Sequence, residues 1–355
     1  MSPGTGNSPD DRPLVALAMG DPAGISPELA AKLIDSATVA AAARLVVIGD
    51  RRILEAGARA AGTMLDIETV EGGSIGPAAK PVLIDLRNLD PARVSVGEAT
   101  PEGGRFAVEN FTLALRLAEA GAVAAVCYTP FNKKAMRFAH PGYDDEGRFI
   151  TELLGLNARA REFNVLDTVW NARVTSHIPL KDVAANLSKE AILAEIALTV
   201  DCLRRSGIDA PRVLVAGLNP HAGDGGSFGM EEIEIIGPAV EAAAANGFDV
   251  SGPHPADTVF VAALKGGYHG VLTMYHDQGQ IAMKLMGFER GVTMLGGLPF
   301  PVCTPAHGTA YDIAGKGIAN RRASEEAVLL AVRMAGSIGF PGVGLTSMTA
   351  GRVGL

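Results

Sequence analysis

Residues 307–320 combine residue types that bind ligands in a stretch that no packing requirement explains. The segment reads His-Gly-Thr-Ala-Tyr-Asp-Ile-Ala-Gly-Lys-Gly-Ile-Ala-Asn. Its glycines permit positive φ and let a ligand approach the main chain closely. Asp312 can accept two hydrogen bonds from the hydroxyls of a ribose, as an acidic residue does where NAD is chosen over NADP. A coenzyme-binding loop is therefore favoured over a simple glycine-rich turn. The candidate coenzyme-binding residues are His307, Gly308, Asp312, Gly315 and Asn320.

Three histidines follow expected strands: His177 in TSHIPL, His221 in GLNPHAGDGG and His276 in MYHDQG. Ligands bind at the carboxyl ends of strands in open α/β sheets, so these imidazoles can converge although they are distant in sequence. Three neutral imidazoles plus one open position form a catalytic-metal arrangement. A single histidine is more often a hydrogen-bonded structural residue. Polar neighbours at the same strand ends favour the metal site, namely Asn219, Asp224, Asp277 and Gln278.

The length and net charge of the chain limit the classes of protein to which it can belong. With 355 residues the chain exceeds the size at which one core stops growing, so two lobes are expected. A net charge of −8 argues against nucleic-acid binding, and an anionic substrate would need a local cationic cluster or a metal. No apolar stretch reaches the ~18 residues that a membrane span needs. The three cysteines lack C-x-x-C spacing, which suits a reducing cytoplasm.

Short apolar runs alternate with segments of helical period, the pattern of an α/β fold with a mainly parallel sheet. The expected strands are 14–19, 45–48, 82–86, 123–128, 212–216 and 270–275. The expected helices are 28–34, 51–61, 105–120, 189–205, 231–246 and 324–338, the last capped by Ser324. Residues 1–12 are polar, lack a signal-peptide pattern and are expected to form a disordered tail. Residues 13–138 and 306–355 are assigned to a first lobe, and residues 139–305 to a second.

The chain resembles the PdxA family in four motifs that occur in the family's order and span almost its whole length. They are GDPAGISPEL at 20–29, GLNPHAGDGGSFGMEE at 217–232, MYHDQGQIAMKLMGFERGV at 274–292 and HGTAYDIAGKG at 307–317. The loop also resembles the adenosine-binding loop of the isocitrate and isopropylmalate dehydrogenase superfamily. The resemblance implies the two-lobed fold of that superfamily, with mainly parallel sheets and an interlobe cleft. It further implies an NAD-dependent homodimer whose active site takes residues from both subunits, with the metal site and dimer interface in the second lobe.

The resemblance also assigns roles to individual residues. His177, His221 and His276 become ligands of a divalent cation, zinc first, with magnesium, cobalt or manganese as alternatives. Asp257, in HPADT, matches a family acid beside the metal, and Lys284 matches a lysine that contacts substrate. Both are candidate catalytic residues, with Lys284 suited to proton transfer or carboxylate binding. Without the surrounding motif, Lys284 would be read as a solvated helix residue.

The chemistry of such a site is oxidation coupled to decarboxylation. A cation that binds a substrate hydroxyl lowers its pKa and favours hydride transfer to a nicotinamide, which gives a β-keto acid that loses carbon dioxide. The expected enzyme is therefore an NAD-dependent decarboxylating dehydrogenase acting on CH–OH of a small anionic substrate. The namesake activity of the family is oxidation of 4-hydroxythreonine 4-phosphate in pyridoxine biosynthesis.

The sequence departs from the family pattern at the substrate positions. A family Gly-His-Thr-Glu segment aligns, with a one-residue gap, to Asp145-Glu146-Gly147-Arg148. A family asparagine and arginine that hold the substrate phosphate align with Thr293 and Val302. Losing a bidentate arginine removes a contact worth about 1.5–3 kcal/mol unless Arg148, Arg290 or Lys133 substitutes for it. The candidate substrate-binding residues are Glu146, Gly147, Arg148, Lys284 and Thr293.

Alternative functions follow from these departures. Within the family, a terephthalate cis-dihydrodiol dehydrogenase or a four-carbon acid sugar phosphate dehydrogenase fits the same scaffold, and the apolar Met294, Phe300 and Val302 would suit a carbocyclic substrate. A metal-dependent lyase or hydrolase without NAD is a different class, against which the Asp312 loop argues. A binding protein without turnover is a third class, and the intact histidines argue against it.

Overall fold

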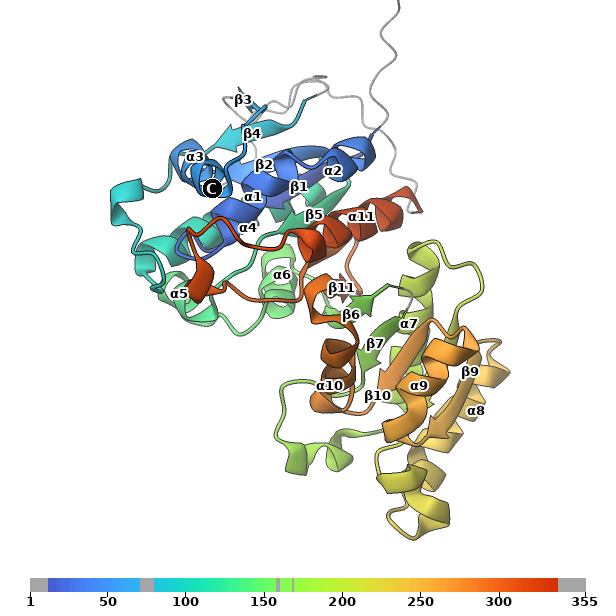
Figure 1. Cartoon of the computed structure of the whole chain (residues 1–355). Coiled ribbons are helices and arrows are strands. Elements are labelled where there is room, and N and C mark those ends of the chain that lie inside the picture. Colours follow the sequence, from blue (N-terminus) through green and yellow to red (C-terminus); the bar gives the residue numbers. More distant parts are fainter. Residues whose placement is uncertain (1–11, 71–79, 158–159, 168, 338–355) are drawn as a thin grey trace, which may run out of the picture.

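Among the described residues, one twelve-stranded sheet has the order β3-β4-β2-β1-β5-β12-β11-β6-β7-β10-β8-β9. Most of its strands are labelled in Figure 1. The computed structural model describes residues 12–70, 80–157, 160–167 and 169–337. The strands are β1 (Leu14–Ala18), β2 (Arg44–Gly49), β3 (Glu68–Val70), β4 (Val82–Asp85), β5 (Ala125–Tyr128), β6 (Arg161–Leu166), β7 (Val169–Arg173), β8 (Arg212–Ala216), β9 (Asp249–His254), β10 (Gly270–Thr273), β11 (Val292–Gly296) and β12 (Val302–Pro305).

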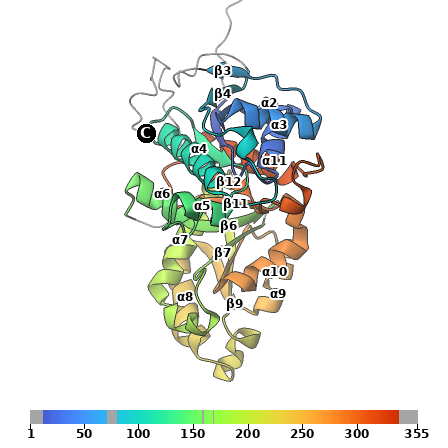
Figure 2. The ribbon, with the colours of Figure 1, turned by 90° about the vertical axis from the view of Figure 1, so that its left-hand side faces the viewer.

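The two lobes are joined where the sheet changes from parallel to antiparallel pairing. The pairs from β3 to β12 are parallel, as are β7–β10, β10–β8 and β8–β9. Between them, β12–β11, β11–β6 and β6–β7 are antiparallel. Figure 2 shows this central part of the sheet passing from the upper lobe into the lower one. The expected two-lobed α/β fold with a mainly parallel sheet is confirmed.

Helices cover both faces of the sheet in each lobe. They are α1 (Ser26–Ile34), α2 (Ala37–Ala42), α3 (Arg51–Ala61), α4 (Pro101–Glu119), α5 (Lys133–Ala139), α6 (Glu146–Leu154), α7 (Lys189–Arg205), α8 (Gly237–Ala245), α9 (Ala256–Gly266), α10 (His276–Gly287) and α11 (Arg322–Gly336). Alternate residues of β1 face opposite cores: Val15 and Leu17 join the core beneath α1, α3 and α11, whereas Ala16 and Ala18 join the core beneath α4 and α6. Burial on both faces explains the continuous apolar runs of β1 and β2.

Packing moves the boundary between the lobes away from residue 139, where the sequence placed it. Helix α6 belongs to the first lobe, because Phe149 stacks on Phe111 of α4 with ring centroids 5.8 Å apart. The chain enters the second lobe through β6, after residue 160. It returns through β12, where Val302 and Cys303 already pair with β5. The expected second lobe, 139–305, is therefore too long at both ends, because local composition does not reveal which lobe a short helix packs on.

The described part of the chain begins at Arg12 and ends at Ser337, just after the last helix. The expected tail at 1–12 lies outside the described residues except for Arg12, as do the last residues of the first lobe, 338–355. Helix α11 begins at Arg322, whose backbone N–H donates to Asn320 Oδ1 at 3.0 Å, so the expected cap at Ser324 is wrong. Cys127, Cys202 and Cys303 are free and buried. Among the described helices, none has the length and apolar character needed to span a bilayer.

Candidate active site

A polar cavity of about 290 Å³ lies at the ends of β5, β7 and β12, where the two lobes meet. Its lining includes Tyr128 and Lys133 from the first lobe and His177 from the second. The cavity thus forms at the carboxyl ends of parallel strands, where an α/β sheet offers its binding sites. The expected site residues on its wall are Glu146, Gly147, His177, Thr293, His307 and Gly308.

His177 and His276 lie side by side at the edge of this cavity, with ring centroids 5.6 Å apart. His177 follows β7 with a positive φ of 52°, and His276 is the first residue of α10. Both residues line an adjoining cavity of about 440 Å³. His177 belongs to the wall of both cavities. The Nδ1 atom of His276 is 2.7 Å from Asp277 Oδ1, which leaves its Nε2 atom for a ligand. Burial lowers the pKa of His177, which favours the neutral imidazole that a metal requires.

His221 does not join this pair within one chain. Within the described part of the chain, no three His, Cys, Asp or Glu side chains come together in a group that could hold a metal ion. The convergence of all three imidazoles in a single chain, which strand-end positions suggested, is therefore wrong. The reason is local: five consecutive residues from His221 to Gly225 have positive φ, and this left-handed turn leaves His221 exposed.

Glu232 holds that left-handed turn in place. Its Oε1 atom accepts hydrogen bonds from the backbone N–H groups of Leu218 and Asn219, both at 2.7 Å, and its Oε2 atom accepts from Asn219 Nδ2 at 2.9 Å. The carboxylate is buried, and a Cβ on Gly223 would lie 2.7 Å from it. Non-glycine residues adopt positive φ only when their surroundings impose it, so the position of His221 is built into the fold.

Lys284 and Asp257 lie outside the main cavity. Lys284 is exposed on α10 and lines a neighbouring pocket of about 100 Å³ that shares Glu162 and Thr293 with the cavity. Residues 276, 280 and 284 follow at intervals of four, so they lie along one face of α10. Asp257 is exposed in the first turn of α9 and lines none of these cavities. Lys284 is thus placed to reach a ligand in the main cavity. Within a single chain, Asp257 has no contact with that cavity.

The beginning of α6 contributes Glu146 and Gly147 to the cavity wall but not Arg148. Asp145 caps the helix by accepting from the Arg148 backbone N–H at 2.8 Å. Burial raises the pKa of Glu146, although the nearby Lys133 ammonium acts in the opposite direction. The Arg148 side chain instead pairs with Asp144 at 3.1 Å and Glu152 at 2.7 Å on the helix surface. Its expected role in substrate binding is therefore not supported, because its guanidinium is engaged outside the cavity.

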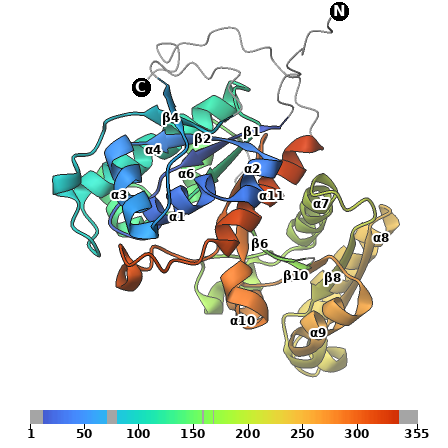
Figure 3. The same ribbon diagram turned by 45° about the horizontal axis from the view of Figure 1, so that its top comes forward.

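The loop between β12 and α11, residues 307–320, packs directly on α1 and α3 (Figure 3). Ile25 N donates to Thr309 O at 3.0 Å, and the Tyr311 hydroxyl donates to Asp21. A Cβ on Gly317, where φ is 73°, would lie 2.3 Å from the carbonyl oxygen of Ala60, so this position needs glycine. The sequence prediction of special backbone geometry in this loop is confirmed.

The polar side chains of the same loop have different surroundings. His307 lines the main cavity; burial lowers its pKa, and its Nε2 atom is buried without a hydrogen-bond partner among the described residues. Asp312 and Gly315 are exposed, as a ligand on the loop surface would require. Asn320 is also exposed, but its Oδ1 atom caps α11. The loop therefore extends from the cavity to an exposed carboxylate.

Comparison with known proteins shows the family of this chain. The sequence model described as "Pyridoxal phosphate biosynthetic protein PdxA" matches residues 41–331. The chain belongs to the PdxA family. A protein of Rhizobium meliloti (strain 1021) named "Putative 4-hydroxythreonine-4-phosphate dehydrogenase 2" is 64% identical over 334 residues, which cover 94% of this chain and 96% of the relative.

Two further PdxA relatives show the range of names in the family. A protein of Symbiobacterium thermophilum named "Putative D-threonate 4-phosphate dehydrogenase" is 37% identical over 328 residues, covering 92% of this chain and 98% of the relative. The crystal structure of 4-hydroxythreonine-4-phosphate dehydrogenase from Klebsiella pneumoniae has a TM-score of 0.79 and 35% identity, covering 92% of this chain and 99% of that one. Each of the three names is that of a 4-phosphate dehydrogenase.

The apolar residues that favoured a carbocyclic substrate are not in the cavity of this PdxA protein. Met294, Phe300 and Val302 are buried in the cores that flank the sheet, and none of them lines the cavity. Val302, which the resemblance aligned with a phosphate-binding arginine, is a packed core residue. Of the three cations proposed to substitute for it, only Lys133 lines the cavity, since Arg290 pairs with Asp167 at 2.8 Å.

Sequence reasoning missed three charged residues of the cavity wall, Arg161, Glu162 and Arg173. The strands that carry them, β6 and β7, were not predicted, because the polar residues interrupt the apolar runs REFNVL and VWNAR. A signal was present nonetheless. Glu162 and Asn164 in the first run, and Asn171 and Arg173 in the second, are two residues apart, which indicates strands with one polar face.

Proposed function

We propose that this chain is an NAD-dependent and divalent-metal-dependent dehydrogenase of the PdxA family. It oxidises the CH–OH group of a small anionic hydroxy acid to a β-keto acid, which then decarboxylates. The observation that carries the proposal is the position of His177. Its imidazole lies beside His276 and on the wall of the same cavity that His307 reaches from the glycine-rich loop. One cavity thus adjoins both the candidate metal ligands and the candidate coenzyme site.

The proposed ligands are three imidazoles, which suit a divalent cation and zinc in particular. One chain supplies only two of them. His177 and His276 supply two imidazoles, and Asp277 orients the second ring. The third ligand in our proposal is His221 of a second copy, since its exposed turn presents the ring outward. A bound divalent cation would polarise the substrate oxygens and lower the pKa of the reacting hydroxyl.

Exposed apolar side chains support a homodimer through the second lobe. Large side chains of this kind are concentrated on the turn that follows His221 and on α9 and α10. They are Phe228, Met230, Ile233, Val261, Leu264, Ile281, Leu285 and Phe288. Apolar surface of this extent marks an interaction site. Association through this surface would be consistent with a metal site shared between copies, because the turn and α10 carry both His221 and His276.

The glycine-rich loop fits a dinucleotide. Asp312 is exposed and suited to accept the two ribose hydroxyls of NAD, while His307 places an imidazole in the cavity. When bound, NAD would accept the hydride from the substrate carbon. The buried Nε2 atom of His307 offers a hydrogen bond to a ligand, and its lowered pKa keeps the ring neutral.

Two substrates deserve first testing, 4-hydroxythreonine 4-phosphate and a four-carbon sugar acid phosphate. The name of the Rhizobium relative supports the first, and that of the Symbiobacterium relative supports the second. The cavity suits either, because it is polar and Lys133 supplies a cation for the anionic group. Thr293 lies on its wall and Lys284 lies in the adjoining pocket, where they can contact the same ligand. If the first substrate is used, the enzyme would serve pyridoxine synthesis.

The test is a substrate panel in which NADH and carbon dioxide are measured together. The panel contains phosphorylated hydroxy-amino acids, four-carbon sugar acid phosphates and an aromatic dihydrodiol carboxylate, each with zinc, magnesium, cobalt or manganese. We expect equal amounts of NADH and carbon dioxide from one of the two phosphorylated classes. Product without NADH would show a lyase or hydrolase instead. Binding of a panel member without turnover under every metal would contradict the proposed dehydrogenase.

A further inference from the structure

Arg173 is a buried arginine on the wall of the main cavity. It ends β7, and the antiparallel register that pairs Asn164 with Asn171 places Glu162 of β6 opposite it. Its Nη1 atom donates to Asn164 Oδ1 at 2.8 Å, and its Nη2 atom forms an ion pair with Glu162 Oε1 at 3.1 Å. The side chain is only 2% exposed. A charged group this deeply buried requires compensation.

The ion pair with Glu162 compensates the charge of Arg173, but two of its nitrogen atoms lack a hydrogen bond. Among the described residues, Nε and Nη2 are buried and find no acceptor with hydrogen-bond geometry. Asn164 Oδ1 cannot serve them, because it already accepts from both Arg173 Nη1 and Gln280 Nε2, each at 2.8 Å. An arginine does not lose its proton, so a buried donor on it that finds no acceptor is destabilising. Nε and Nη2 together form the edge of the guanidinium that binds an oxyanion in a bidentate manner.

The other charges around the cavity leave room for an anion. Arg161 is held by Glu195 at 2.9 Å, and Asp145 accepts a backbone hydrogen bond as the cap of α6. Glu146 and Glu162 are the remaining carboxylates, and Lys133 is a further cation. Burial raises the pKa of Glu146, which favours its uncharged form. Lys133 and the Nε–Nη2 edge of Arg173, which keeps its ion pair with Glu162, are thus the cationic groups of the wall that a ligand could approach.

We infer that the Nε–Nη2 edge of Arg173 binds the oxyanion of the substrate, a carboxylate or phosphate group. The inference deepens the proposed function by naming the residue that receives the anionic group of its substrate. Arg173 would bind the substrate and determine its specificity. The ion pair with Glu162 and the hydrogen bond to Asn164 fix the direction of the guanidinium edge. Because Arg and Lys differ in geometry, a lysine at this position keeps the charge but loses the bidentate contact.

The experiment measures anion binding by the full-length protein without NAD or metal. Inorganic phosphate and malonate are the two probes. Calorimetric titration measures the affinity for each anion, and thermal unfolding measures the stabilisation that each anion gives. The variants are Arg173→Met, Arg173→Lys, and Arg173→Met combined with Glu162→Gln, which avoids leaving the partly exposed Glu162 carboxylate without its ion pair. The matched control is Arg44→Met, because Arg44 is also buried but begins β2 and lies outside the cavity wall.

We expect Arg173→Met to weaken binding of one probe about ten- to a hundredfold, with a smaller loss for Arg173→Lys. Arg44→Met should leave the affinity unchanged whatever it does to stability. Preference for phosphate or for malonate identifies the group that occupies the site. Unchanged affinity in the double variant, or no binding of either probe by the wild-type protein, overturns the inference. Since neither NAD nor turnover enters the measurement, a failed dehydrogenase assay would leave this result standing.

Discussion

Glu28 and Lys32, one turn apart on α1, hold the backbone of the glycine-rich loop from both sides. Glu28 accepts from Ala319 N at 2.7 Å and from Gly317 N at 3.2 Å. Lys32 Nζ donates to Gly317 O at 3.0 Å and Ala319 O at 2.8 Å, and the two side chains pair with each other at 2.7 Å. The loop conformation is therefore set before any coenzyme binds, which reduces the entropic cost of binding.

Replacing Glu28 with glutamine should lower the affinity for NAD about five- to thirtyfold while the fold is kept. The amide group turns one acceptor into a donor against a backbone N–H and leaves Lys32 without its counter-charge, a loss of about 1–2 kcal/mol. NAD titration of the purified variant measures the effect. Glu55→Gln is the matched control, since Glu55 forms an exposed ion pair with Arg51 at the same i,i+4 spacing. Equal NAD affinity in both variants would show that the clamp does not shape the coenzyme site.

Asp312→Ala should weaken NAD far more than NADP. The carboxylate is exposed on the loop, where it can accept two ribose hydroxyls of NAD but repels the phosphate of NADP. Losing hydrogen bonds to a charged acceptor predicts a rise in the KM for NAD of about tenfold or more. Steady-state kinetics with each coenzyme, at saturating substrate, give the ratio. An equal change for NAD and NADP would refute contact between Asp312 and the ribose.

A metal site shared between two copies predicts that certain inactive variants restore each other. His177→Ala and His221→Ala should each abolish turnover with the fold intact. When the two are unfolded together and refolded, half of the dimers are mixed, and each mixed dimer contains one complete site. Activity should therefore return to about a quarter of the wild-type value in a twofold-symmetric dimer.

Mixing His177→Ala with His276→Ala supplies the control for that result. Both residues come from the same copy in the proposed site, so no combination of these chains contains an intact pair. We expect no recovery of activity from this mixture. Recovery here, or none in the mixture with His221→Ala, would contradict a shared site. Full activity of His221→Ala alone would remove that histidine from the site altogether.

The elements that sequence alone located were those with one strong periodic signal. Residues 51–61 and 189–205 were predicted within the bounds of α3 and α7, because apolar positions recur at helical spacing and each helix has a side-chain cap. The buried runs that became β1, β2 and β8 were found because parallel strands covered on both faces are continuously apolar. The loop at 307–320 was found from its residue types, since positive φ and close packing both require glycine.

What sequence could not supply depends on contacts between distant segments. The polar strands β6 and β7 were missed because the buried Arg173 of one strand is explained only by its ion pair with Glu162 of the other. The direction of His221 depends on a left-handed turn that Glu232 holds in place. Arg148 was named as a candidate and Arg173 was not, because proximity to a motif is visible in a sequence, whereas the wall of a cavity is not.

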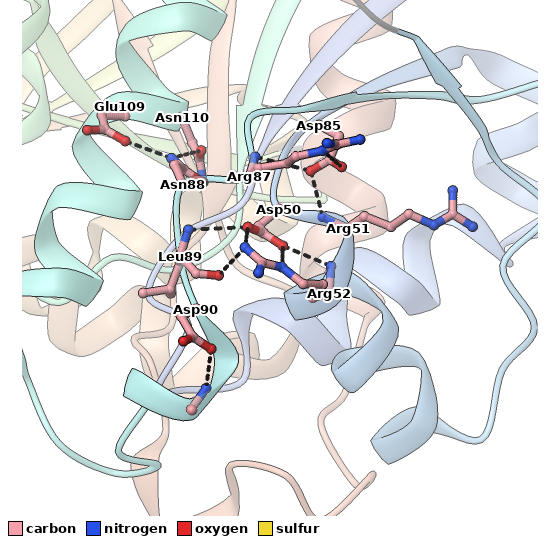
Figure 4. A network of polar contacts seen from close by, with 11 residues as sticks. Asp50, Arg51, Arg52, Asp85, Arg87, Asn88, Leu89, Asp90, Glu109 and Asn110 are labelled. Atoms are coloured by element: carbon pink, nitrogen blue, oxygen red, sulfur yellow. Dashed lines mark hydrogen bonds and ion pairs between the residues drawn. The ribbon is translucent and has the colours of Figure 1, made fainter.

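Asp50 provides a test of how acid weakens the first lobe (Figure 4). It is fully buried at the beginning of α3 and accepts from Arg52 Nη2 at 2.7 Å, from Arg52 N at 2.9 Å and from Leu89 N at 3.2 Å, which ties α3 to the chain after β4. Burial acts to raise the pKa of Asp50, but the hydrogen bonds from Arg52 and Leu89 outweigh it, and the pKa is lowered from 3.8.

Because the folded-state pKa lies below the unfolded one, the unfolded chain takes up the proton first as the pH falls. The stabilisation by Asp50 is thus complete above the unfolded value, near pH 4, and is lost as the pH falls through the folded pKa. Asp50→Asn should reduce the free energy of unfolding by about 1–3 kcal/mol at neutral pH, with a smaller deficit in acid. Urea unfolding near pH 7 and near pH 3 measures both values. Asp66→Asn removes an exposed pair with Lys80 and should change little at either pH. A deficit of Asp50→Asn that is the same at both pH values would mean that the ionised carboxylate adds nothing to the stability of this junction.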